Sequence, residues 1–221
     1  MNWKQHLLNS CVGFFLLSLV AGTAWQSRPQ SVSTTVESKR VALTFDDGPN
    51  WKYTPQLLEG LKERNVVCSF FLLGQRIEVQ KDLVQDMYED GHLLGNHTYA
   101  HKRLCTLSDQ EACEELNKTS VLIEEITGEE CLYVRPPYGD WKEELSQELS
   151  VIPVLWTVDS MDWSLKDPEK VVQRVVSQVQ DGDIILMHDD YATSVEAALT
   201  IVDRLLEEGY TFVTVDQLIL D

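Results

Sequence analysis

Two histidines, His97 and His101, are four positions apart in the segment HTYAH. Side chains at positions i and i+4 share a face of a helical turn, and this spacing occurs in metal sites that contain two imidazoles. Asp46 and Asp47 are adjacent carboxylates that repel each other unless a cation or an arginine offsets their charge. The segment DDGP is also typical of a plain turn. Two imidazoles and one carboxylate, however, would leave a position for water, as catalytic zinc sites do.

Four further reactive side chains follow short apolar segments later in the chain. Arg135 opens the stiff segment RPPYG, Asp159 and Asp162 belong to the segment DSMDW, and His188 follows the apolar run IILM. Each has a purely structural alternative: a simple turn for RPPYG, a helix cap for one aspartate, and a buried structural imidazole for His188. Their common position after apolar runs favours the functional interpretation.

Short apolar runs alternate with helical patterns from residue 39 onward. Strands are expected at residues 41–45, 66–73, 92–95, 132–134, 152–158, 183–187 and 210–215. Helices are expected at about residues 53–63, 80–89, 108–126, 141–149, 168–180 and 194–208. Ser108 with Glu111 fits a capping box, and Asp167 before Pro168 fits an N-cap followed by proline in the first helical turn.

The composition of the expected strands predicts a parallel sheet. Strands rich in Val, Ile and Leu without polar alternation are buried on both faces, and strand–helix alternation indicates an α/β fold, either a barrel or an open doubly wound sheet. The reactive side chains follow these strands at their carboxyl ends, which meet on one face where barrel enzymes assemble their sites. The sequence contains neither G-x-G-x-x-G nor G-x-x-x-x-G-K-[ST], so no motif supports dinucleotide or P-loop nucleotide binding.

The overall composition is that of a globular protein with an acidic surface. The chain has 221 residues, of which 43% are hydrophobic and 24% charged, and this length favours one domain. The formal net charge is -18, from 18 basic and 36 acidic side chains. Because duplex nucleic-acid binding needs a basic surface, nucleic acid is excluded as a partner.

The N-terminal segment predicts export. Residues 1–27 contain Lys4 as their only charged side chain, and residues 11–24 are nearly all apolar or small. This pattern predicts a secretory signal peptide cleaved after Ala24, or an uncleaved N-terminal membrane anchor. With either alternative the remaining chain is exported, and it contacts the membrane only through residues 1–27 if they are retained.

The segment after this leader predicts a linker followed by one domain. Residues 28–38 are rich in Ser and Thr and have no periodicity, whereas residues 39–221 carry the strand–helix pattern. Export permits a disulfide between two of the cysteines Cys105, Cys113 and Cys131, although their spacing does not give a connectivity.

Five segments together resemble the motifs of the carbohydrate esterase family 4 polysaccharide deacetylases, also called the NodB-homology family. In family order they are TFDDGP (44–49), HTYAH (97–101), RPPYG (135–139), DSMDW (159–163) and LMH (186–188). The resemblance extends over about residues 39–221 and implies a single-domain, distorted (β/α)7 barrel. It implies metal-dependent removal of acetyl groups from N-acetylated, or less often O-acetylated, carbohydrate polymers. No reactive position departs from the family pattern.

The resemblance also implies a metal and a substrate pocket. The metal ligands would be Asp47, His97 and His101. Zn²⁺ is the expected ion, with Co²⁺ or another divalent ion as the alternative. Tyr138 would offer its backbone N–H to the oxyanion, and Trp163 and Leu186 would shape a pocket for the acetyl methyl group.

The same resemblance implies an acid–base pair. Asp46 would be the catalytic base and His188 the catalytic acid. Arg135 would pair with Asp46, and Asp162 would orient His188 and tune its pKa. Amide hydrolysis needs both groups, because the attacking water must lose a proton and the amine leaves poorly until it gains one.

These residues lead us to expect an exported, monomeric deacetylase that acts on N-acetylglucosamine residues of a cell-wall polysaccharide, with peptidoglycan foremost. Chitooligosaccharide and acetylxylan are alternative substrates. Tyr138 resembles the glucosamine-directed branch, because arginine is usual at that position in the muramic-acid branch. Two other classes share some features: non-haem Fe(II) oxygenases, which use two histidines and a carboxylate on double-sheet barrels, and a catalytically silent wall-binding module, which would need neither Asp46 nor His188.

Overall fold

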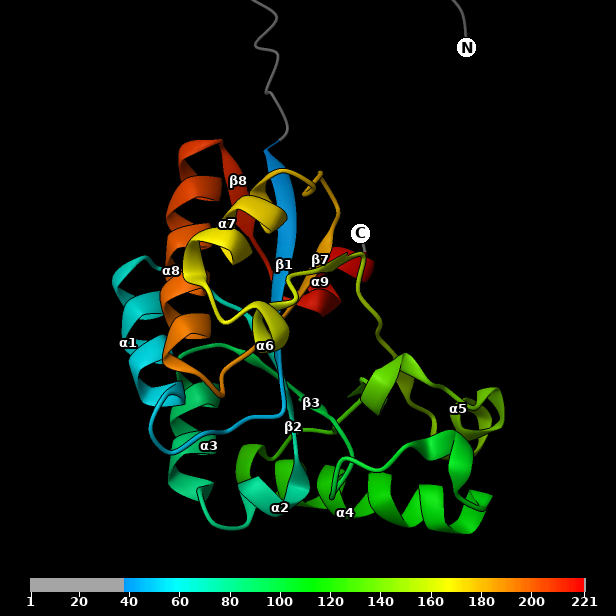
Figure 1. Ribbon diagram of the computed structural model, residues 1–221. Helices are drawn as coiled ribbons and strands as arrows, with labels where there is room; N and C mark the ends of the chain where they lie inside the picture. Colours follow the sequence, from blue (N-terminus) through cyan, green and yellow to red (C-terminus); the bar gives the residue numbers. More distant parts are fainter. Residues whose placement is uncertain (1–37, 221) are drawn as a thin grey trace, which may run out of the picture. The chain divides into compact units, whose positions relative to one another are not determined.

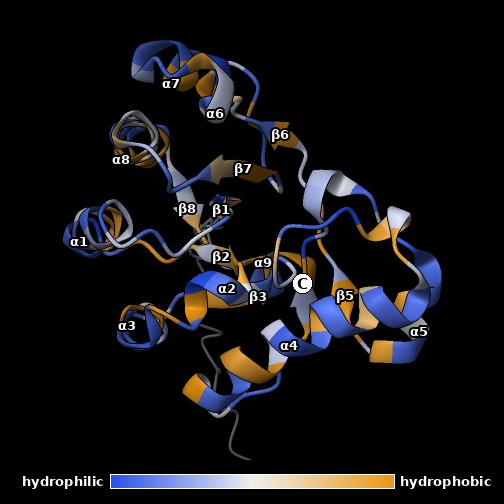
Figure 2. Cartoon of the chain, turned by 60° about the horizontal axis from the view of Figure 1, so that its bottom comes forward, coloured by the Kyte–Doolittle hydropathy of each residue, from blue (hydrophilic) through white to orange (hydrophobic). Residues whose placement is uncertain are grey.

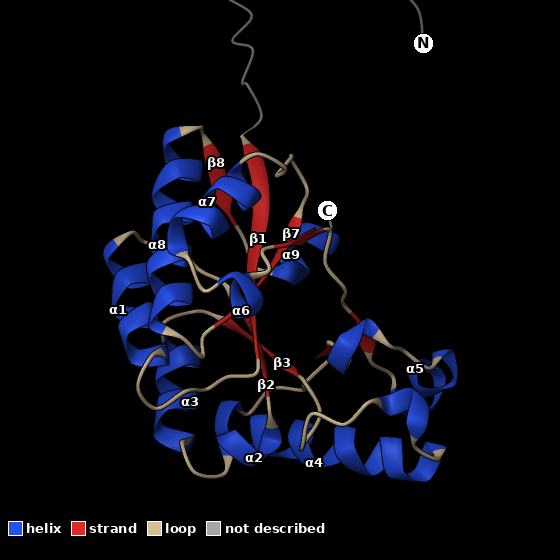
Figure 3. Cartoon of the chain, in the orientation of Figure 1, coloured by secondary structure: helices blue, strands red, loops and turns tan. Residues whose placement is uncertain are grey.

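Eight parallel strands form one curled sheet in the computed structural model, which describes residues 38–220 (Figures 1 and 3). The strands follow the order β5-β4-β3-β2-β1-β7-β6, and β8 pairs with the first part of β1. Their bounds are β1 (Lys39–Asp46), β2 (Ser69–Leu72), β3 (Leu93–Asn96), β4 (Tyr133–Val134), β5 (Ile152–Pro153), β6 (Val158–Asp159), β7 (Ile184–His188) and β8 (Tyr210–Phe212). Within residues 38–220 no pairing joins β5 to β6, so the sheet curls without closing. The predicted distorted (β/α)7 barrel is confirmed.

Helices connect the strands and cover the outer side of the sheet. The longer ones are α1 (Thr54–Glu63), α3 (Lys81–Glu89), α4 (Asp109–Thr127), α5 (Glu143–Leu149), α7 (Pro168–Val176) and α8 (Ala192–Glu207). Short turns of helix, which the sequence did not predict, are α2 (Gly74–Ile77), α6 (Asp162–Leu165), α9 (Val215–Ile219), η1 (Leu104–Thr106) and η2 (Pro137–Gly139). Both predicted caps are present, the Ser108–Glu111 capping box of α4 and the Asp167 cap of α7.

The two faces of β1 carry different chemistry. Successive side chains of a strand point to opposite faces. Val41, Leu43 and Phe45 belong to the main apolar core, between the sheet and helices α1, α3, α7 and α8. Figure 2 shows α1, α3 and α8 beside the strands. Thr44 and Asp46 lie on the opposite face, inside the curled sheet, where both are buried and hydrogen-bonded.

The strand predicted at residues 152–158 is wrong as a single element. Its two ends form β5 and β6, which lie at opposite edges of the sheet. Between them, the carbonyls of Val154 and Leu155 accept hydrogen bonds from the Arg135 side chain at 3.1 and 3.3 Å. The hydrogen bonds to β4 end at Val154, whose N–H donates to the carbonyl of Val134 at 2.8 Å. The segment therefore crosses the open side of the barrel, where Arg135 takes the place of a strand partner.

The predictions for the N-terminal segment, residues 1–27 and 28–37, lie outside the described residues. None of the described helices combines the length and the apolar character needed to cross a bilayer. Four cysteines are described, Cys68, Cys105, Cys113 and Cys131, and all four are free thiols. The disulfide considered for the last three is therefore not formed in this structure.

Candidate active site

The register of the parallel strands brings the reactive residues to one edge of the sheet. Asp46, the last residue of β1, pairs directly with His188 at the end of β7. On the other side of β1, the pairing of β2 with β3 and of β3 with β4 sets Asn96 level with Val134. His97 and Arg135 follow these two residues, so they leave the sheet beside each other.

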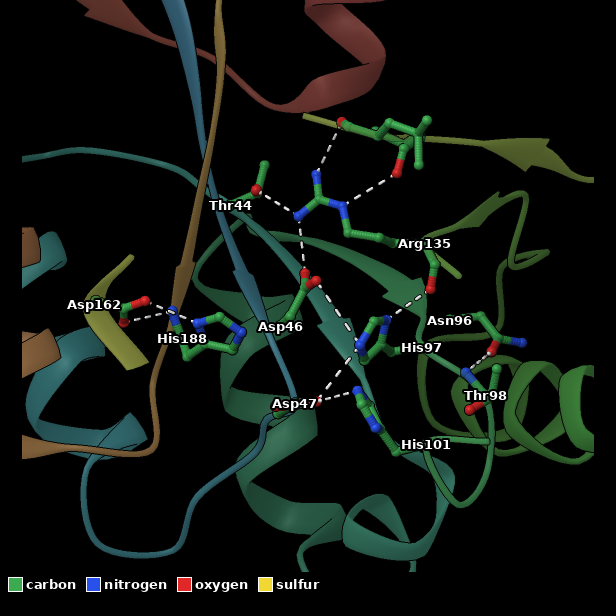
Figure 4. Close-up of polar contacts among 12 residues, drawn as sticks. Thr44, Asp46, Asp47, Asn96, His97, Thr98, His101, Arg135, Asp162 and His188 are labelled. Carbon is green, nitrogen blue, oxygen red and sulfur yellow. Dashed lines mark hydrogen bonds and ion pairs between the residues drawn. The ribbon is translucent and has the colours of Figure 1, made fainter. Parts of the chain in front are cut away.

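Asp47, His97 and His101 form a compact cluster just beyond this edge (Figure 4). Oδ1 of Asp47 lies 3.5 Å from Nε2 of His97 and 3.3 Å from Nε2 of His101. One candidate ligand atom from each residue lies within 4.8 Å of the other two. The three residues predicted to bind a metal are thus brought together.

The hydrogen-bonding state of this cluster suits a bound cation. Nδ1 of His97 lies 2.6 Å from the carbonyl oxygen of Arg135, so Nδ1 carries the proton and Nε2 presents a lone pair. Asp47 Oδ1 is buried and accepts no hydrogen bond from the described residues. Burial lowers the pKa of His101, and the neighbouring His97 lowers it further against the opposing charge of Asp47. A carboxylate oxygen without a hydrogen bond and two imidazole nitrogens that face one another fit a divalent metal ion.

Asp46 has different surroundings from its neighbour Asp47. Its Oδ1 accepts a hydrogen bond of 2.8 Å from Nη1 of Arg135, which also donates to Thr44 Oγ1 at 2.6 Å. The Thr44 hydroxyl in turn donates to the carbonyl of Ile185 at 2.7 Å. Burial lowers the pKa of Arg135, whereas the charge and the hydrogen bond of Asp46 raise it. The repulsion between the two adjacent carboxylates is relieved because one faces an arginine and the other faces the histidine pair.

His188 forms a second ion pair on the other side of the cluster (Figure 4). Its Nδ1 lies 2.8 Å from Asp162 Oδ1, and its backbone N–H donates to Asp162 Oδ2 at 3.0 Å. Burial acts to lower the pKa of His188, but the hydrogen bond and charge of Asp162, together with Asp46 and Asp47, outweigh it and raise the pKa to about 9. His188 is therefore an imidazolium at neutral pH. Asp162 takes up its Nδ1, so Nε2 is the nitrogen that remains for a substrate.

Tyr138 lies against the metal-ligand side of the site. Its ring meets the ring of His101 edge to face at 4.9 Å, and the guanidinium of Arg103 lies over it at 4.3 Å. Arg103 also forms an ion pair with Asp140, two residues after Tyr138. No acceptor among the described residues takes the backbone N–H of Tyr138.

The two other residues predicted to contact substrate differ in exposure. Trp163 is about half exposed at the start of α6, where it is available to a ligand. Leu186 is buried inside β7, level with Thr44 and Asp159. Leu186 therefore contributes to the wall of the barrel rather than to its open surface.

Positive φ angles cluster at this edge of the barrel. Five non-glycine residues there have left-handed backbones: Asp47 (72°), Thr98 (67°), His101 (55°), Tyr138 (64°) and Met161 (57°). Such conformations are uncommon outside glycine, and each costs on the order of 1–3 kcal/mol. Two are candidate metal ligands and a third precedes Asp162, so the strain falls on the residues that orient the site.

Sequence reasoning missed three supporting residues. Thr44 accepts a hydrogen bond from the Arg135 side chain. Ser160 Oγ donates to Asp162 Oδ1 at 3.1 Å. Asn96 accepts from the N–H of Thr98 at 2.8 Å and donates to α4 through the carbonyl of Leu116 at 2.8 Å and Ser120 Oγ at 2.9 Å. The sequence did contain a signal for Asn96. Burying a side-chain amide at the end of an apolar strand costs free energy unless the amide is hydrogen-bonded, so its presence there indicates a partner.

Fold and site together define a (β/α)7 barrel protein with a three-residue candidate metal site at the carboxyl ends of its strands. Residues 33–154 match the sequence model of the family described as polysaccharide deacetylase. The chain belongs to this family.

Named relatives agree with this assignment. The peptidoglycan-N-acetylmuramic acid deacetylase PdaC of Bacillus subtilis is 40% identical over 87% of this chain and 41% of its own length. Its solved structure superposes with a TM-score of 0.80 over 82% of this chain and 90% of that chain. The peptidoglycan-N-acetylglucosamine deacetylase PgdA of Listeria monocytogenes is 37% identical over 82% of this chain and 39% of its own length. The chain thus spans about two fifths of these two relatives.

One structural relative is not an active enzyme. A CE4 family pseudoenzyme from Bacillus anthracis is 30% identical and superposes with a TM-score of 0.77, over 82% of this chain and 65% of that chain. Membership of the family therefore does not by itself establish catalysis, and the side chains of the site carry that argument.

Proposed function

We propose that this protein hydrolyses the acetamido group of N-acetylglucosamine residues in a cell-wall polysaccharide, peptidoglycan foremost, and releases acetate. The observation that carries the proposal is the pairing of two proton-transfer groups on either side of one metal cluster. Asp46 is held by Arg135, and His188 is held by Asp162. A binding module would need neither pair.

A zinc ion is the proposed metal. Asp47, His97 and His101 offer one oxygen and two nitrogen ligands, a donor set that suits Zn²⁺ and also admits Co²⁺. When bound, such an ion supplies a Lewis acid that lowers the pKa of water and stabilises negative charge on a carbonyl oxygen.

The protein groups would perform the proton transfers of amide hydrolysis. Asp46 Oδ2 lies 3.8 Å from His97 Nε2, at the metal-ligand face, where it would take a proton from the attacking water. A C–O bond forms at the acetyl carbon, and the backbone N–H of Tyr138 would donate to the oxyanion. When the C–N bond breaks, protonated His188 would give its proton to the leaving amine. The products are acetate and a free amino sugar.

The identity of the sugar is the finer part of the proposal. The relatives are named for activity on N-acetylglucosamine and on N-acetylmuramic acid. Tyr138 stands where arginine is usual in the muramic-acid branch, and this supports N-acetylglucosamine. Chitooligosaccharide and acetylxylan remain the alternative substrates. The observed barrel disfavours the oxygenase alternative, which is usual on double-sheet barrels.

Location and assembly are proposed on the sequence alone. The apolar segment at residues 11–24 supports export, either secreted or anchored to the membrane and facing the cell wall. The enzyme is also proposed to act as a monomer.

Acetate release tests the proposal. Residues 28–221 are incubated with peptidoglycan, chitooligosaccharides and acetylxylan after metal removal and after addition of Zn²⁺ or Co²⁺. We expect release from the N-acetylglucosamine polymers that depends on added metal. Release that survives thorough chelation, or that survives Asp47→Ala, would overturn the proposal. Binding to the wall without release from any polymer would support the silent wall-binding module.

A further inference from the structure

Four aromatic side chains are strongly exposed among the described residues, and all four follow the carboxyl end of a strand. The exposed fractions are 75% for Trp51 after β1, 57% for Tyr138 after β4, 49% for Trp163 after β6 and 37% for Tyr191 after β7. Leaving large aromatic surface in water is unfavourable, so its confinement to one edge of the barrel indicates a ligand there. The proposed reaction uses only Tyr138 and Trp163.

The two unused aromatic residues come from loops that are joined to each other. Asn50 Nδ2 donates to Asp190 Oδ1 at 3.0 Å. Trp51 directly follows Asn50, and Tyr191 directly follows Asp190. We call Trp51 and Tyr191 the aromatic pair. The two residues therefore leave the backbone from neighbouring points on the surface.

Hydrogen bonds hold the two loops in place before any ligand binds. The side-chain oxygen of Asn50 accepts from the N–H groups of Lys52 and Tyr53 at 3.0 and 3.1 Å. Arg76 of α2 pairs with Asp190, with Nη2 3.1 Å from Oδ2. A large side chain on a preorganised loop loses less conformational entropy on binding than one on a free loop.

The aromatic pair is continuous with the reaction site. Trp51 is four residues after Asp47, and Tyr191 is three residues after His188. The pair therefore stands on the loops that follow Asp47 and His188, whereas the Tyr138 ring contacts His101 from the loop after β4. A polymer bound across the site would meet aromatic rings from several of these loops.

We propose that the aromatic pair is a stacking subsite for a sugar ring of the polysaccharide other than the ring being deacetylated. This inference rests on the proposed function. Trp and Tyr present a rigid face that suits the C–H face of a pyranose, with polar groups at the edge for its hydroxyls. Asn50 and Asp190 stand beside the pair as such polar groups, and Lys166 Nζ lies over one face of the Tyr191 ring, 4.5 Å from its centre.

The composition of the two loops favours a carbohydrate over a protein partner. Trp51 is surrounded in sequence by Asn50, Lys52 and Tyr53, and Tyr191 follows Asp190. No aliphatic side chain stands in either run, so the two exposed rings stand beside amide and charged groups. Protein interfaces are instead depleted of charge at their centres.

Chain-length dependence tests the subsite. kcat/KM for acetate release is measured on chitooligosaccharides of two to six rings for the wild type, Trp51→Ala and Trp51→Phe. For Trp51→Ala we expect kcat/KM on the longest substrate to fall about tenfold through KM, as lost stacking predicts. The disaccharide should be unaffected, and Trp51→Phe should retain most of the activity. Equal kcat/KM for wild type and Trp51→Ala at every length, or an equal loss at every length, would overturn the inference.

A binding measurement separates this inference from the proposed function. Calorimetric titration with chitohexaose in the presence of a chelator reports affinity without turnover. Weaker binding by Trp51→Ala than by wild type supports the subsite even if no polymer releases acetate, whereas equal binding, or no binding by the wild type, overturns it. Leu220→Ala is the matched control, because Leu220 is 73% exposed after α9, which contacts the start of β2 at the far end of the barrel.

Discussion

The adjacent carboxylates of Asp46 and Asp47 have different surroundings, and these suit them to different roles. Asp46 accepts a hydrogen bond from a fully buried arginine, which fixes one of its oxygens. Asp47 has a left-handed backbone and a buried oxygen without a hydrogen bond, aimed at His97 and His101. The two adjacent side chains thus face different partners, Arg135 for Asp46 and the two histidines for Asp47.

The first prediction separates metal binding from proton transfer at these two positions. Both variants are loaded with Zn²⁺ and then dialysed. Asp47→Asn should lose most of the added zinc, because an amide oxygen carries no negative charge for the cation. Asp46→Asn should keep the added zinc and lose activity by about 10²–10⁴-fold, the usual contribution of a general base, which is the role proposed for Asp46. Zinc content by elemental analysis and acetate release are measured on both variants. Equal zinc content in the two variants would contradict the division of tasks.

The second prediction concerns the ion pair of His188. In its proposed role as general acid, His188 must be protonated, so kcat/KM should fall as the pH rises through its pKa of about 9. Asp162→Asn removes the negative charge that raises this pKa. The pKa should then move toward the ordinary value of about 6.5, and the fall in kcat/KM should begin at lower pH. The measurement is the pH profile of kcat/KM.

The control for this profile is Asp167→Asn. Asp167 is a carboxylate at the surface that caps α7 and pairs with Lys170, and it is not among the charges that raise the pKa of His188. Its replacement should leave the basic limb unchanged. A basic limb that stays at the same pH in Asp162→Asn would show that Asp162 does not set the protonation of His188.

At the scale of elements, the open side of the barrel depends on Arg135. Its guanidinium reaches from β4 to the carbonyls of Val154 and Leu155, which lie in the segment between β5 and β6. It also lies over the ring of Phe71 at 4.1 Å. One side chain therefore both anchors Asp46 and spans the gap in the sheet.

The third prediction follows from this double task. Arg135→Met should lower the free energy of unfolding by about 3–5 kcal/mol, because it leaves Asp46 as a buried charge without its partner. Arg64→Met is the matched control: Arg64 makes a bidentate pair with Asp203 at 2.7 and 2.9 Å, but at the surface. That loss should stay below about 1 kcal/mol. Urea denaturation measures both, and similar losses would contradict the spanning role of Arg135.

The sequence predicted most elements because their patterns are local. Short apolar runs between helical patterns indicated the positions of the strands. The caps at Ser108 and Asp167 indicated where two helices begin. The interruption of the strand expected at 152–158 could not be predicted, because it depends on Arg135, about twenty residues earlier in the chain. The order of strands in the sheet is likewise a property of tertiary packing.

The candidate site was predicted residue by residue but not in its geometry. Side-chain type and strand-end position were enough to single out the aspartates and histidines. The left-handed backbones at Thr98 and Tyr138 are not encoded in residue types that favour them, since neither is glycine. At Thr98 the conformation is held by a local contact, because its N–H donates to the side chain of Asn96 two residues earlier. The same amide also donates to α4, and that contact becomes visible only once the helix is placed.

At the scale of the whole molecule, the charge of -18 should affect which polymers approach the site. The positive side chains near the site are largely paired: Arg103 with Asp140, and Lys102 with Glu115 at 2.8 Å. The acidic excess therefore repels a polysaccharide that carries carboxylates, whereas a neutral chitooligosaccharide experiences no such force. Added salt shortens the range of this repulsion, with a Debye length of about 10 Å at 0.1 M.

The last prediction therefore compares two substrates across ionic strength. Between about 0.01 and 0.15 M salt, kcat/KM on a carboxylate-bearing wall polysaccharide should rise about three- to tenfold, because screening removes the unfavourable steering of like charges. On chitohexaose, kcat/KM should stay constant over the same range, which controls for effects of salt on the enzyme itself. A rise on both substrates would indicate salt-dependent folding or metal binding. A constant value on both would mean that the polymer approaches over a locally neutral surface, and that the acidic excess is confined to faces the substrate does not meet.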